Sequence, residues 1–257
     1  MPSILYEIKD TVAIITLNRP DKLNAFNREM GLLLQGTLDK CESDKSVRAV
    51  YITGAKAFSA GQDLAEAADP NGPGLQKILS EQFNPIITRI RNLSKPVVAA
   101  VNGVAAGAGA NIALSCDIVV ASASSVFIQA FTKIGLIPDS GGTYFLPRLI
   151  GWQKASALML LGDKVEAGEA EKMGMIYRVF PDENFEAESF KIADKLSVMP
   201  TRALALTKQA LNNSITNSLE KQLICEDELQ TIAGSSRDYV EGVSAFLQKR
   251  KPVFTGE

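Results

Sequence analysis

The run "KPVVAAVNG" (residues 95–103) constrains the fold more than any other part of the sequence. Five consecutive apolar residues, Val97 to Val101, follow a proline and stop at a polar turn. Such a run is typical of a strand that is buried on both faces, and strands of that kind belong to parallel sheets covered by helices. The sequence therefore predicts an α/β fold.

Other segments alternate between strand and helix patterns. Residues 6–20 read as two short strands joined by a turn near Lys9, Asp10 and Thr11. Residues 27–41 have apolar side chains at helical spacing, and residues 109–117 read as a short helix. Further strands are expected at residues 48–55 and 118–125. Repeated strand-then-helix units indicate a largely parallel sheet.

The character of the chain changes near Pro200. Residues 201–214 and 218–234 are helical in pattern, and no further strand pattern follows. We therefore expect a core at residues 1–198 that carries the site, and a helical module at residues 199–257. The apolar stripes of this module need burial partners, which favours oligomerisation. The Pro/Gly segment at residues 67–74 is expected to be the most mobile loop.

Composition excludes several classes of protein. The chain has 257 residues, is 46% hydrophobic, and carries a net charge of −2. This balance gives no electrostatic case for binding nucleic acid or an anionic membrane. No apolar run is long enough for a transmembrane helix, and the first residues do not resemble a secretory signal. Three widely spaced cysteines read as free thiols, so we expect a cytoplasmic protein.

The sequence contains no histidine. Catalysis by Ser-His-Asp or Cys-His groups is therefore excluded, and so are histidine metal sites. No CxxC pair is present to bind zinc, and no metal site is expected. Any proton transfer must use carboxylates, lysine, tyrosine or backbone groups.

Two turns rich in small residues could bind a ligand through the backbone. One is "AFSAGQDL" (residues 57–64), and the other is "VNGVAAGAGANIAL" (residues 101–114). The first could be an ordinary strand-to-helix turn. The second is an incomplete GxGxxG motif, which leaves a nicotinamide-dependent dehydrogenase open as an alternative. Together the two turns could each supply one N–H group to a carbonyl oxygen and form an oxyanion hole.

Two further stretches carry candidate groups. In "GLIPDSGGT" (residues 135–143), Asp139 is a lone carboxylate among small and apolar residues. Either Asp139 or Ser140 caps the following helix, or Asp139 is a desolvated acid-base group. The basic stretch "AFLQKRKPVF" (residues 245–254) reads either as a solvated helix end or as a phosphate contact.

Six motifs in the same order resemble the crotonase superfamily, the enoyl-CoA hydratase/isomerase family. They are "ITLNRPDKLNAF", "AFSAGQDL", "KPVVAAVNGVAAGAG", "IGLIPDSGGTYFLPRLIG", "EAEKMGMIYRVF" and "EGVSAFLQKRKPVF", and they span essentially the whole chain. The resemblance implies a crotonase-like spiral of ββα units with a C-terminal helical trimerisation module, assembled as a homo-trimer or homo-hexamer. It implies acyl-CoA thioester substrates, and no cofactor besides the coenzyme A of the substrate.

The resemblance also implies roles for individual residues. The oxyanion-hole N–H groups fall on Gln62 and Ala108. Coenzyme A is expected along six residues of two motifs: Lys22, Leu23, Ala25, Ala60, Asp63 and Leu64. Phe246 and Lys249 are expected to reach the nucleotide bound by a neighbouring subunit. The acyl pocket is expected to be lined by Phe83, Asn111, Phe131 and Leu136.

The sequence departs from the hydratases of this family at both catalytic glutamates. Those positions hold Asn111 and Phe131, whereas Asp139 occupies a position where hydratases usually have glycine and isomerases have aspartate. Some dehalogenases share this aspartate, but Phe131 and the lack of histidine disfavour that chemistry.

Three segments, "GVAAGAG", "GLIPDSGGT" and "EGVSAFLQKR", resemble the branch that isomerises ring-epoxidised phenylacetyl-CoA. The resemblance thus implies an isomerase in which Asp139 shuttles one proton. Alternatives are a true enoyl-CoA hydratase acting on 2-enoyl-CoA, and a non-enzymatic member that binds acyl-CoA or RNA.

Overall fold

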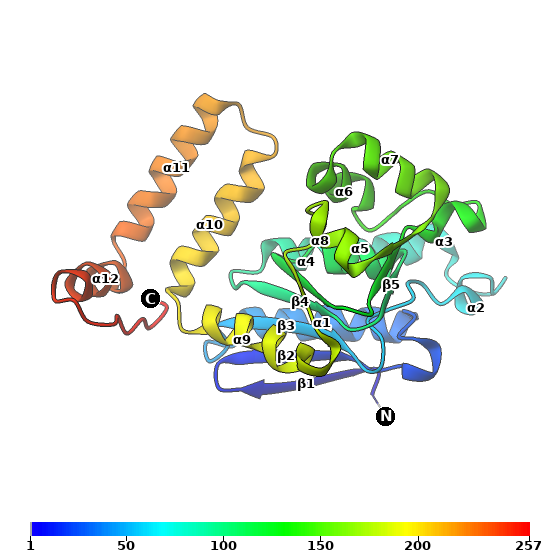
Figure 1. Cartoon of the computed structure of the whole chain (residues 1–257), viewed down its shortest axis with the longest axis horizontal. Helices are drawn as coiled ribbons and strands as arrows, with labels where there is room; N and C mark the ends of the chain where they lie inside the picture. Colours follow the sequence, from blue (N-terminus) through cyan, green and yellow to red (C-terminus); the bar gives the residue numbers. More distant parts are fainter. Residues whose placement is uncertain (1) are drawn as a thin grey trace.

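The computed structural model describes residues 2–257 and has an α/β fold (Figure 1). Its main sheet has six strands in the order β1-β2-β3-β4-β6-β9, and all neighbours are parallel except β1 and β2. These strands are Ile4–Lys9, Val12–Leu17, Ala49–Gly54, Val97–Val101, Ile118–Ser122 and Arg178–Phe180. A smaller sheet has the order β5-β7-β8, with bounds Val104–Ala106, Val126–Ile128 and Lys164–Glu166.

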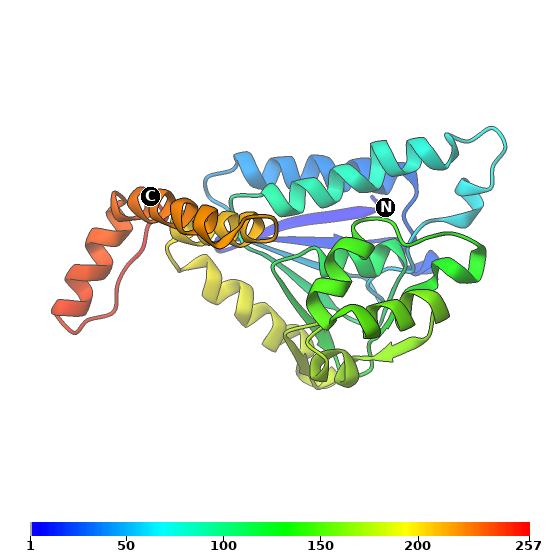
Figure 2. The same ribbon diagram turned by 90° about the horizontal axis from the view of Figure 1, so that it is seen from above.

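Helices cover both faces of the main sheet. Figure 2 shows α1 and α4 on one side of it and α9 on the other. The helices of the core are α1 Arg28–Ser43, α2 Leu64–Ala67, α3 Gly74–Lys77, the π-helix η2 Ile78–Phe83, α4 Asn84–Asn92, α5 Ala108–Leu114, α6 Gly142–Ile150, α7 Trp152–Leu161, α8 Ala167–Lys172 and α9 Phe185–Ser197. Short 3-10 turns complete the core: η1 Pro20–Lys22, η3 Ala130–Ile134 and η4 Asp182–Asn184.

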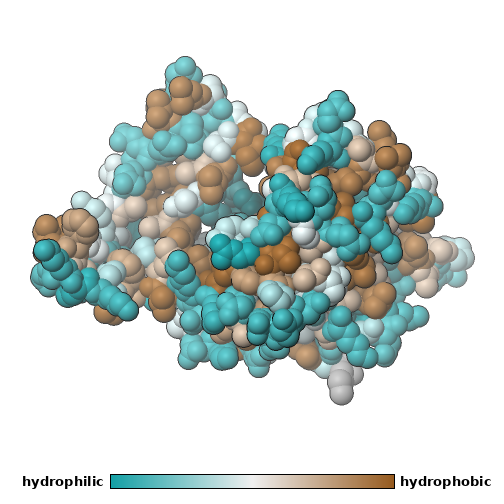
Figure 3. Space-filling view, viewed as in Figure 1, coloured by the Kyte–Doolittle hydropathy of each residue, from teal (hydrophilic) through white to brown (hydrophobic). Residues whose placement is uncertain are grey.

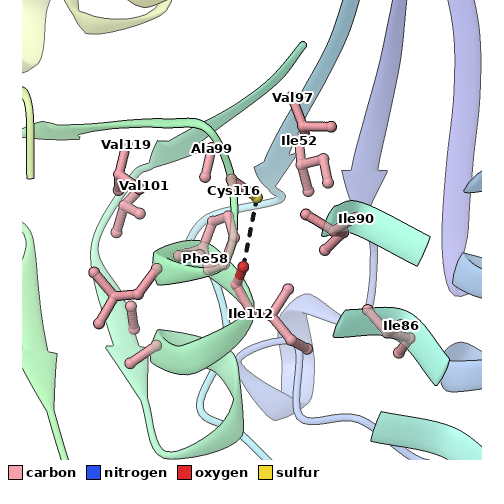
Figure 4. Close-up of a cluster of buried hydrophobic side chains, with 14 of the residues drawn as sticks. Ile52, Phe58, Ile86, Ile90, Val97, Ala99, Val101, Ile112, Cys116 and Val119 are labelled. Carbon is pink, nitrogen blue, oxygen red and sulfur yellow. Dashed lines mark hydrogen bonds between the residues drawn. The ribbon is translucent and has the colours of Figure 1, made fainter. Parts of the chain in front are cut away.

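Strand β4 lies at the centre of the sheet, and every one of its residues is buried. Because side chains alternate along a strand, its residues feed two hydrophobic clusters. Val97, Ala99 and Val101 face the cluster under α1 and α4, whereas Val98 and Ala100 face α9. Figure 4 shows the first cluster, where Val97 and Ala99 lie among residues from β3, α4 and α5. The prediction of a strand buried on both faces is confirmed.

Local sequence accounts for the ends of the elements. Asp10 adopts a positive φ of 55° at the turn between β1 and β2, and Lys9 pairs with Val12. Asn27 caps α1, because its side chain accepts a hydrogen bond from the Met30 N–H.

The C-terminal helices stand apart from the core (Figure 1). They are α10 Thr201–Ser214, α11 Leu219–Gly234 and α12 Arg237–Leu247. Lys208 anchors α10 to the core, since its Nζ lies 2.8 Å from an Asp117 oxygen and donates to the Ile90 carbonyl at 2.7 Å. Figure 3 shows hydrophobic side chains on the surface of α11 and α12, where Leu219 and Leu223 are exposed. The boundary after residue 198 and the role of these helices in assembly stay predictions.

Within residues 2–257 no helix has the length and apolar character needed to cross a bilayer.

Candidate active site

Two backbone turns lie side by side at the end of the main sheet. The first follows β3, and the second joins β5 to α5. The Ser59 N–H donates to the Val104 carbonyl at 2.9 Å, and the Ala106 N–H donates to the Ser59 carbonyl at 2.8 Å. A parallel bridge between Ser59 and Ala105 completes the pairing. These bonds hold the two turns of the predicted oxyanion hole in contact.

Glycines make this close contact feasible. Gly61 has a φ of +95°, and a Cβ there would lie 2.8 Å from the Ala106 oxygen. A Cβ on Gly109 would lie 2.6 Å from the Ser59 Cβ and 2.7 Å from the Ser59 oxygen. Gly107, at the start of α5, has a φ of +51°. Only residues without a Cβ allow the backbones to approach this closely.

The two N–H groups predicted as oxyanion donors are left without protein acceptors. The Phe26 N–H donates to the Gly61 carbonyl at 2.7 Å, and the Asp63 N–H donates to the Phe26 carbonyl at 2.9 Å. In this pairing the Gln62 N–H points away from Phe26, and no residue from 2 to 257 accepts it. Ala108 is the first residue of α5, so its N–H has no partner within the helix.

Both donors occupy one small region. A Cβ built on Gly61, the residue before Gln62, would lie 3.4 Å from the Ala108 nitrogen. Two backbone N–H groups that point at one thioester oxygen can stabilise negative charge on it. The assignment of that role to Gln62 and Ala108 stays a prediction.

Asp139 lies between η3 and α6, and it is half-buried. Burial raises the pKa of the Asp139 carboxyl above its ordinary value, and the Ser140 hydroxyl, which donates to Oδ1 at 2.8 Å, lowers it in part. The interpretation of Asp139 or Ser140 as a cap of the following helix is wrong, because α6 begins at Gly142 without any side-chain cap. Ser140 has a φ of 51°, which is uncommon for a residue with a side chain.

A buried amide links Asp139 to the second turn. Asn111, which is fully buried in α5, donates from Nδ2 to the main-chain oxygen of Asp139 at 2.8 Å. The same oxygen accepts the Gly142 N–H at 2.8 Å. Asn111 lies three residues after Ala108, so this bond brings the carboxylate segment to the helix that carries the second donor.

Two of the three apolar residues predicted for the acyl pocket lie beside the second turn. Phe131 is buried, and its ring lies 3.7 Å from the position of a Cβ on Gly107. Leu136 is half-buried, and its N–H donates to the Phe131 carbonyl at 3.0 Å. Phe83 is fully buried and packs edge-on against Phe26 with the ring centroids 5.9 Å apart. Phe131 and Leu136 are therefore next to the second turn, whereas Phe83 belongs to the core behind the first one.

The residues predicted for coenzyme A form one edge of the first turn. The Ala60 N–H donates to the Leu23 carbonyl at 2.8 Å, and the Ala25 N–H donates to the Lys22 carbonyl at 3.0 Å. Asp63 caps α2, since it accepts the Ala65 N–H at 3.1 Å. Lys22, Leu23 and Leu64 have exposed side chains on this edge.

Sequence patterns did not reveal two residues that build this edge. Arg19 donates to the Ala25 carbonyl and lies 3.0 Å from an Asp63 oxygen. Asn24 is fully buried and donates to the Ala57 carbonyl at 2.6 Å. Both lie in the "ITLNRPDKLNAF" motif, but no local pattern showed which of its polar residues turn inward.

Phe246 and Lys249 lie far from this edge within one chain. Phe246 is 82% exposed at the end of α12, and Lys249 follows it at an exposed turn. Figure 1 places α12 and α2 at opposite ends of the molecule. Any contact of Phe246 or Lys249 with coenzyme A therefore requires a second subunit, which stays a prediction.

No group of three or more Cys, Asp or Glu residues with metal-binding geometry occurs within residues 2–257. The three cysteines are free.

Comparisons with known proteins agree with this geometry. The family model described as enoyl-CoA hydratase/isomerase matches residues 7–257. The 1,2-epoxyphenylacetyl-CoA isomerase of Escherichia coli strain K12 is 47% identical over 261 residues, covering 100% of both chains. The 2,3-dehydroadipyl-CoA hydratase of the same organism is 36% identical over 257 residues, again covering 100% of both chains.

A solved structure shows the same fold. The enoyl-CoA hydratase of Bacillus anthracis superposes with a TM-score of 0.93 at 33% identity, and the match covers 99% of this chain and 100% of the other. The family model, the relatives and the paired backbone turns lead to one conclusion: this chain belongs to the enoyl-CoA hydratase/isomerase family.

Proposed function

We propose that this protein is an acyl-CoA isomerase that acts on ring-epoxidised phenylacetyl-CoA or a related enoyl-CoA. In this proposal the N–H groups of Gln62 and Ala108 stabilise a thioester enolate, and Asp139 moves one proton. The observation that carries the proposal is the half-buried Asp139, whose main-chain oxygen is bonded through Asn111 to the helix of the second donor.

The chemistry follows from these groups. The Asp139 carboxylate removes a proton from the carbon next to the thioester carbonyl, and the electron pair moves onto the carbonyl oxygen. Two preorganised N–H donors stabilise that oxygen, and the loss of one such donor typically costs about 3–4 kcal/mol. The protonated Asp139 then returns the proton to another carbon on the same face. A buried carboxylate with a raised pKa is a stronger base for the first step.

The relatives support both an isomerase and a hydratase, because the Escherichia coli proteins described above carry both names. The site favours the isomerase. A hydratase of this family holds its water between two acids, and those positions are Asn111 and Phe131 here. Both polar atoms of the Asn111 amide are already bonded, Nδ2 to the Asp139 oxygen and Oδ1 to Gln129.

A nicotinamide-dependent dehydrogenase and an RNA-binding protein are both disfavoured. The glycines that resembled a dinucleotide motif, Gly107 and Gly109, belong to the turn that packs on Ser59, in a chain of the enoyl-CoA hydratase/isomerase family. That family membership speaks against the dehydrogenase. The net charge of −2 speaks against an RNA-binding role.

The proposal includes an assembly of three or six chains, in which α12 of one subunit brings Phe246 and Lys249 to the coenzyme A of another. The exposure of Phe246 and of Leu219 and Leu223 in α11 supports it. We also propose a cytoplasmic location, which the three free cysteines support.

The test offers the enzyme two thioesters side by side, a simple 2-enoyl-CoA and ring-epoxidised phenylacetyl-CoA. Mass and ultraviolet spectra of the products distinguish the two reactions, because isomerisation leaves the mass unchanged and hydration adds one water. We expect conversion of the cyclic thioester without a change of mass. Fast hydration of the 2-enoyl-CoA, together with an unaltered cyclic thioester, would establish the hydratase instead.

A further inference from the structure

We propose that Asn111 and Gln129 are positioning residues, whose chain of hydrogen bonds holds Asp139 in place beside the second oxyanion turn. This inference rests on the proposed function, because it explains how the proton-shuttling residue of that function is oriented. Neither residue needs to touch the substrate.

The chain of bonds is short, buried and directional. Gln129 lies just after β7 and is 5% exposed; its Nε2 donates to Asn111 Oδ1 at 2.8 Å. Asn111 Nδ2 donates in turn to the Asp139 main-chain oxygen at 2.8 Å. Because Asn111 is fully buried, its amide is shielded from the solvent, which would otherwise compete for these bonds.

The surroundings allow only one orientation of the Asn111 amide. The Asp139 oxygen already accepts the Gly142 N–H at 2.8 Å, and a carbonyl oxygen can only accept hydrogen bonds. If the amide were reversed, Asn111 Oδ1 would face the Asp139 oxygen and repel it. Nδ2 must therefore point at Asp139, and Oδ1 must accept from Gln129.

Two features of the structure accompany this orientation. Gln129 Oε1 is buried without a hydrogen-bond partner, and such an acceptor is destabilising. The fold accepts this unpaired acceptor, and Gln129 Nε2 still donates its hydrogen bond to Asn111 Oδ1. Gly142 leaves room for the amide, because a Cβ there would collide with Asn111, 3.0 Å from its Oδ1.

The bond from Asn111 to Asp139 also fits the replacement, at position 111, of the glutamate that hydratases of this family have there. A carboxylate at that position would place negative charge against the Asp139 main-chain oxygen, whereas an amide supplies a donor. No charged side chain of residues 2–257 is among the causes of the raised pKa of Asp139. Helix α5 has no charged residue, and Lys133 of η3 and Arg148 of α6 lie against Gly162 and the Tyr144 ring, respectively.

The variant Asn111→Asp tests the donor directly, because it keeps the shape of the side chain. When the introduced carboxyl is protonated, it can still donate to the Asp139 oxygen; when it is ionised, it cannot. We expect kcat relative to wild type to fall by about 10- to 100-fold as the pH rises from about 5 to 9, with KM little changed. A ratio that does not change with pH would overturn the proposal.

The matched control is Asn102→Asp. Asn102 is a half-buried asparagine whose Nδ2, like that of the fully buried Asn111, donates to a main-chain oxygen, here that of Gly54. It has no contact with Asp139, so the ratio of its kcat to that of wild type is expected to stay constant with pH. If the kcat ratio of this control changed with pH as much as that of Asn111→Asp, the effect would come from general destabilisation. That result would overturn the proposal.

A second pair of variants keeps the test valid if Asn111→Asp does not fold. In Gln129→Glu the carboxylate attracts Asn111 Nδ2 and draws it away from Asp139, although residue 129 does not touch Asp139 itself. Gln129→Met removes the donor without attracting the amide. We expect a loss of about 10-fold in kcat for the first and a smaller loss for the second. Equal losses would mean that packing alone is disturbed, and would overturn the proposal.

Asp139→Asn in the same series separates the two hypotheses. Full activity in Asp139→Asn contradicts the proposed function. A slow Asp139→Asn, combined with a pH-independent Asn111→Asp ratio, contradicts only the positioning role.

Discussion

Gly109→Ala should lower kcat much more than it lowers stability, because it disturbs the contact between the two oxyanion turns. The added Cβ would lie 2.6 Å from the Ser59 Cβ, about 0.8 Å short of the 3.4 Å at which ordinary contact begins. The second obstacle is the Ser59 main-chain oxygen at 2.7 Å, which cannot rotate away. The two turns must therefore move apart by several tenths of an ångström.

Opposing terms determine the stability of this variant. Alanine is favoured over glycine within a helix by about 1 kcal/mol, whereas overpacking costs about 1–3 kcal/mol. We expect a net loss near 1 kcal/mol, which lowers Tm by about 2–4 °C in a chain of this size. Catalysis should suffer more, because a misplaced oxyanion donor costs about 10²–10³ in kcat.

The assay compares kcat, KM and Tm with those of Gly36→Ala. Gly36 lies within α1 and has open space where its Cβ would be, so this control should gain stability and keep its activity. Wild-type kcat together with a raised Tm in Gly109→Ala would refute the close contact between the turns.

Three further predictions concern single side chains and N–H groups. In Ser140→Ala the pKa of Asp139 should rise further, because the Ser140 hydroxyl lowers it; the acidic limb of kcat/KM, where the base is lost by protonation, should move to higher pH. An unshifted limb would show that Asp139 does not control the rate. Gln62→Ala should keep much of the activity, since it keeps the N–H, whereas a folded Gln62→Pro should lose about 10²–10³-fold in kcat; equal kcat values would remove Gln62 from the oxyanion hole. Lys249→Glu should weaken acyl-CoA binding in a titration at low salt and less so at high salt, where exposed charges are screened. An unchanged affinity at low salt would exclude Lys249 from the site.

Sequence patterns predicted most of the main sheet, because its central strands β2, β3, β4 and β6 are apolar and largely buried. The strands expected at residues 48–55 and 118–125 appear as β3 and β6, and the helix expected at residues 27–41 appears as α1. The small sheet was missed. Its strands β5, β7 and β8 have three residues each, and a segment of that length shows no periodicity. Their pairing depends on contacts between distant parts of the chain.

The candidate site was predicted unevenly, and the reason is physical. The glycine-rich turns and Asp139 could be predicted from the sequence. Runs of small residues after a strand are unusual, and so is a single acid among small and apolar residues. The environment of Asp139 is not visible, since Asn111, Gln129 and Ser140 approach it only through the fold. Asn111 was expected to line the acyl pocket. Its amide is instead bonded on both sides, while a contact of its carbon atoms with the acyl group stays a prediction.

The isomerase account depends on Asp139 acting as a carboxylate. Asp139→Asn keeps the size of the side chain and removes its charge. The folded variant should be no less stable at neutral pH, because burial raises the pKa of Asp139 and so penalises its ionised form in the folded state. It should also still bind acyl-CoA, since the edge at residues 22–25 and 60–64 is unchanged.

The most direct measurement is the kcat of Asp139→Asn for the isomerisation of ring-epoxidised phenylacetyl-CoA, at a pH where the wild-type carboxyl is ionised. The account predicts a loss of about 10²–10⁴-fold, the usual contribution of a positioned acid-base group. A folded variant that isomerises this thioester at the wild-type rate would contradict the central claim.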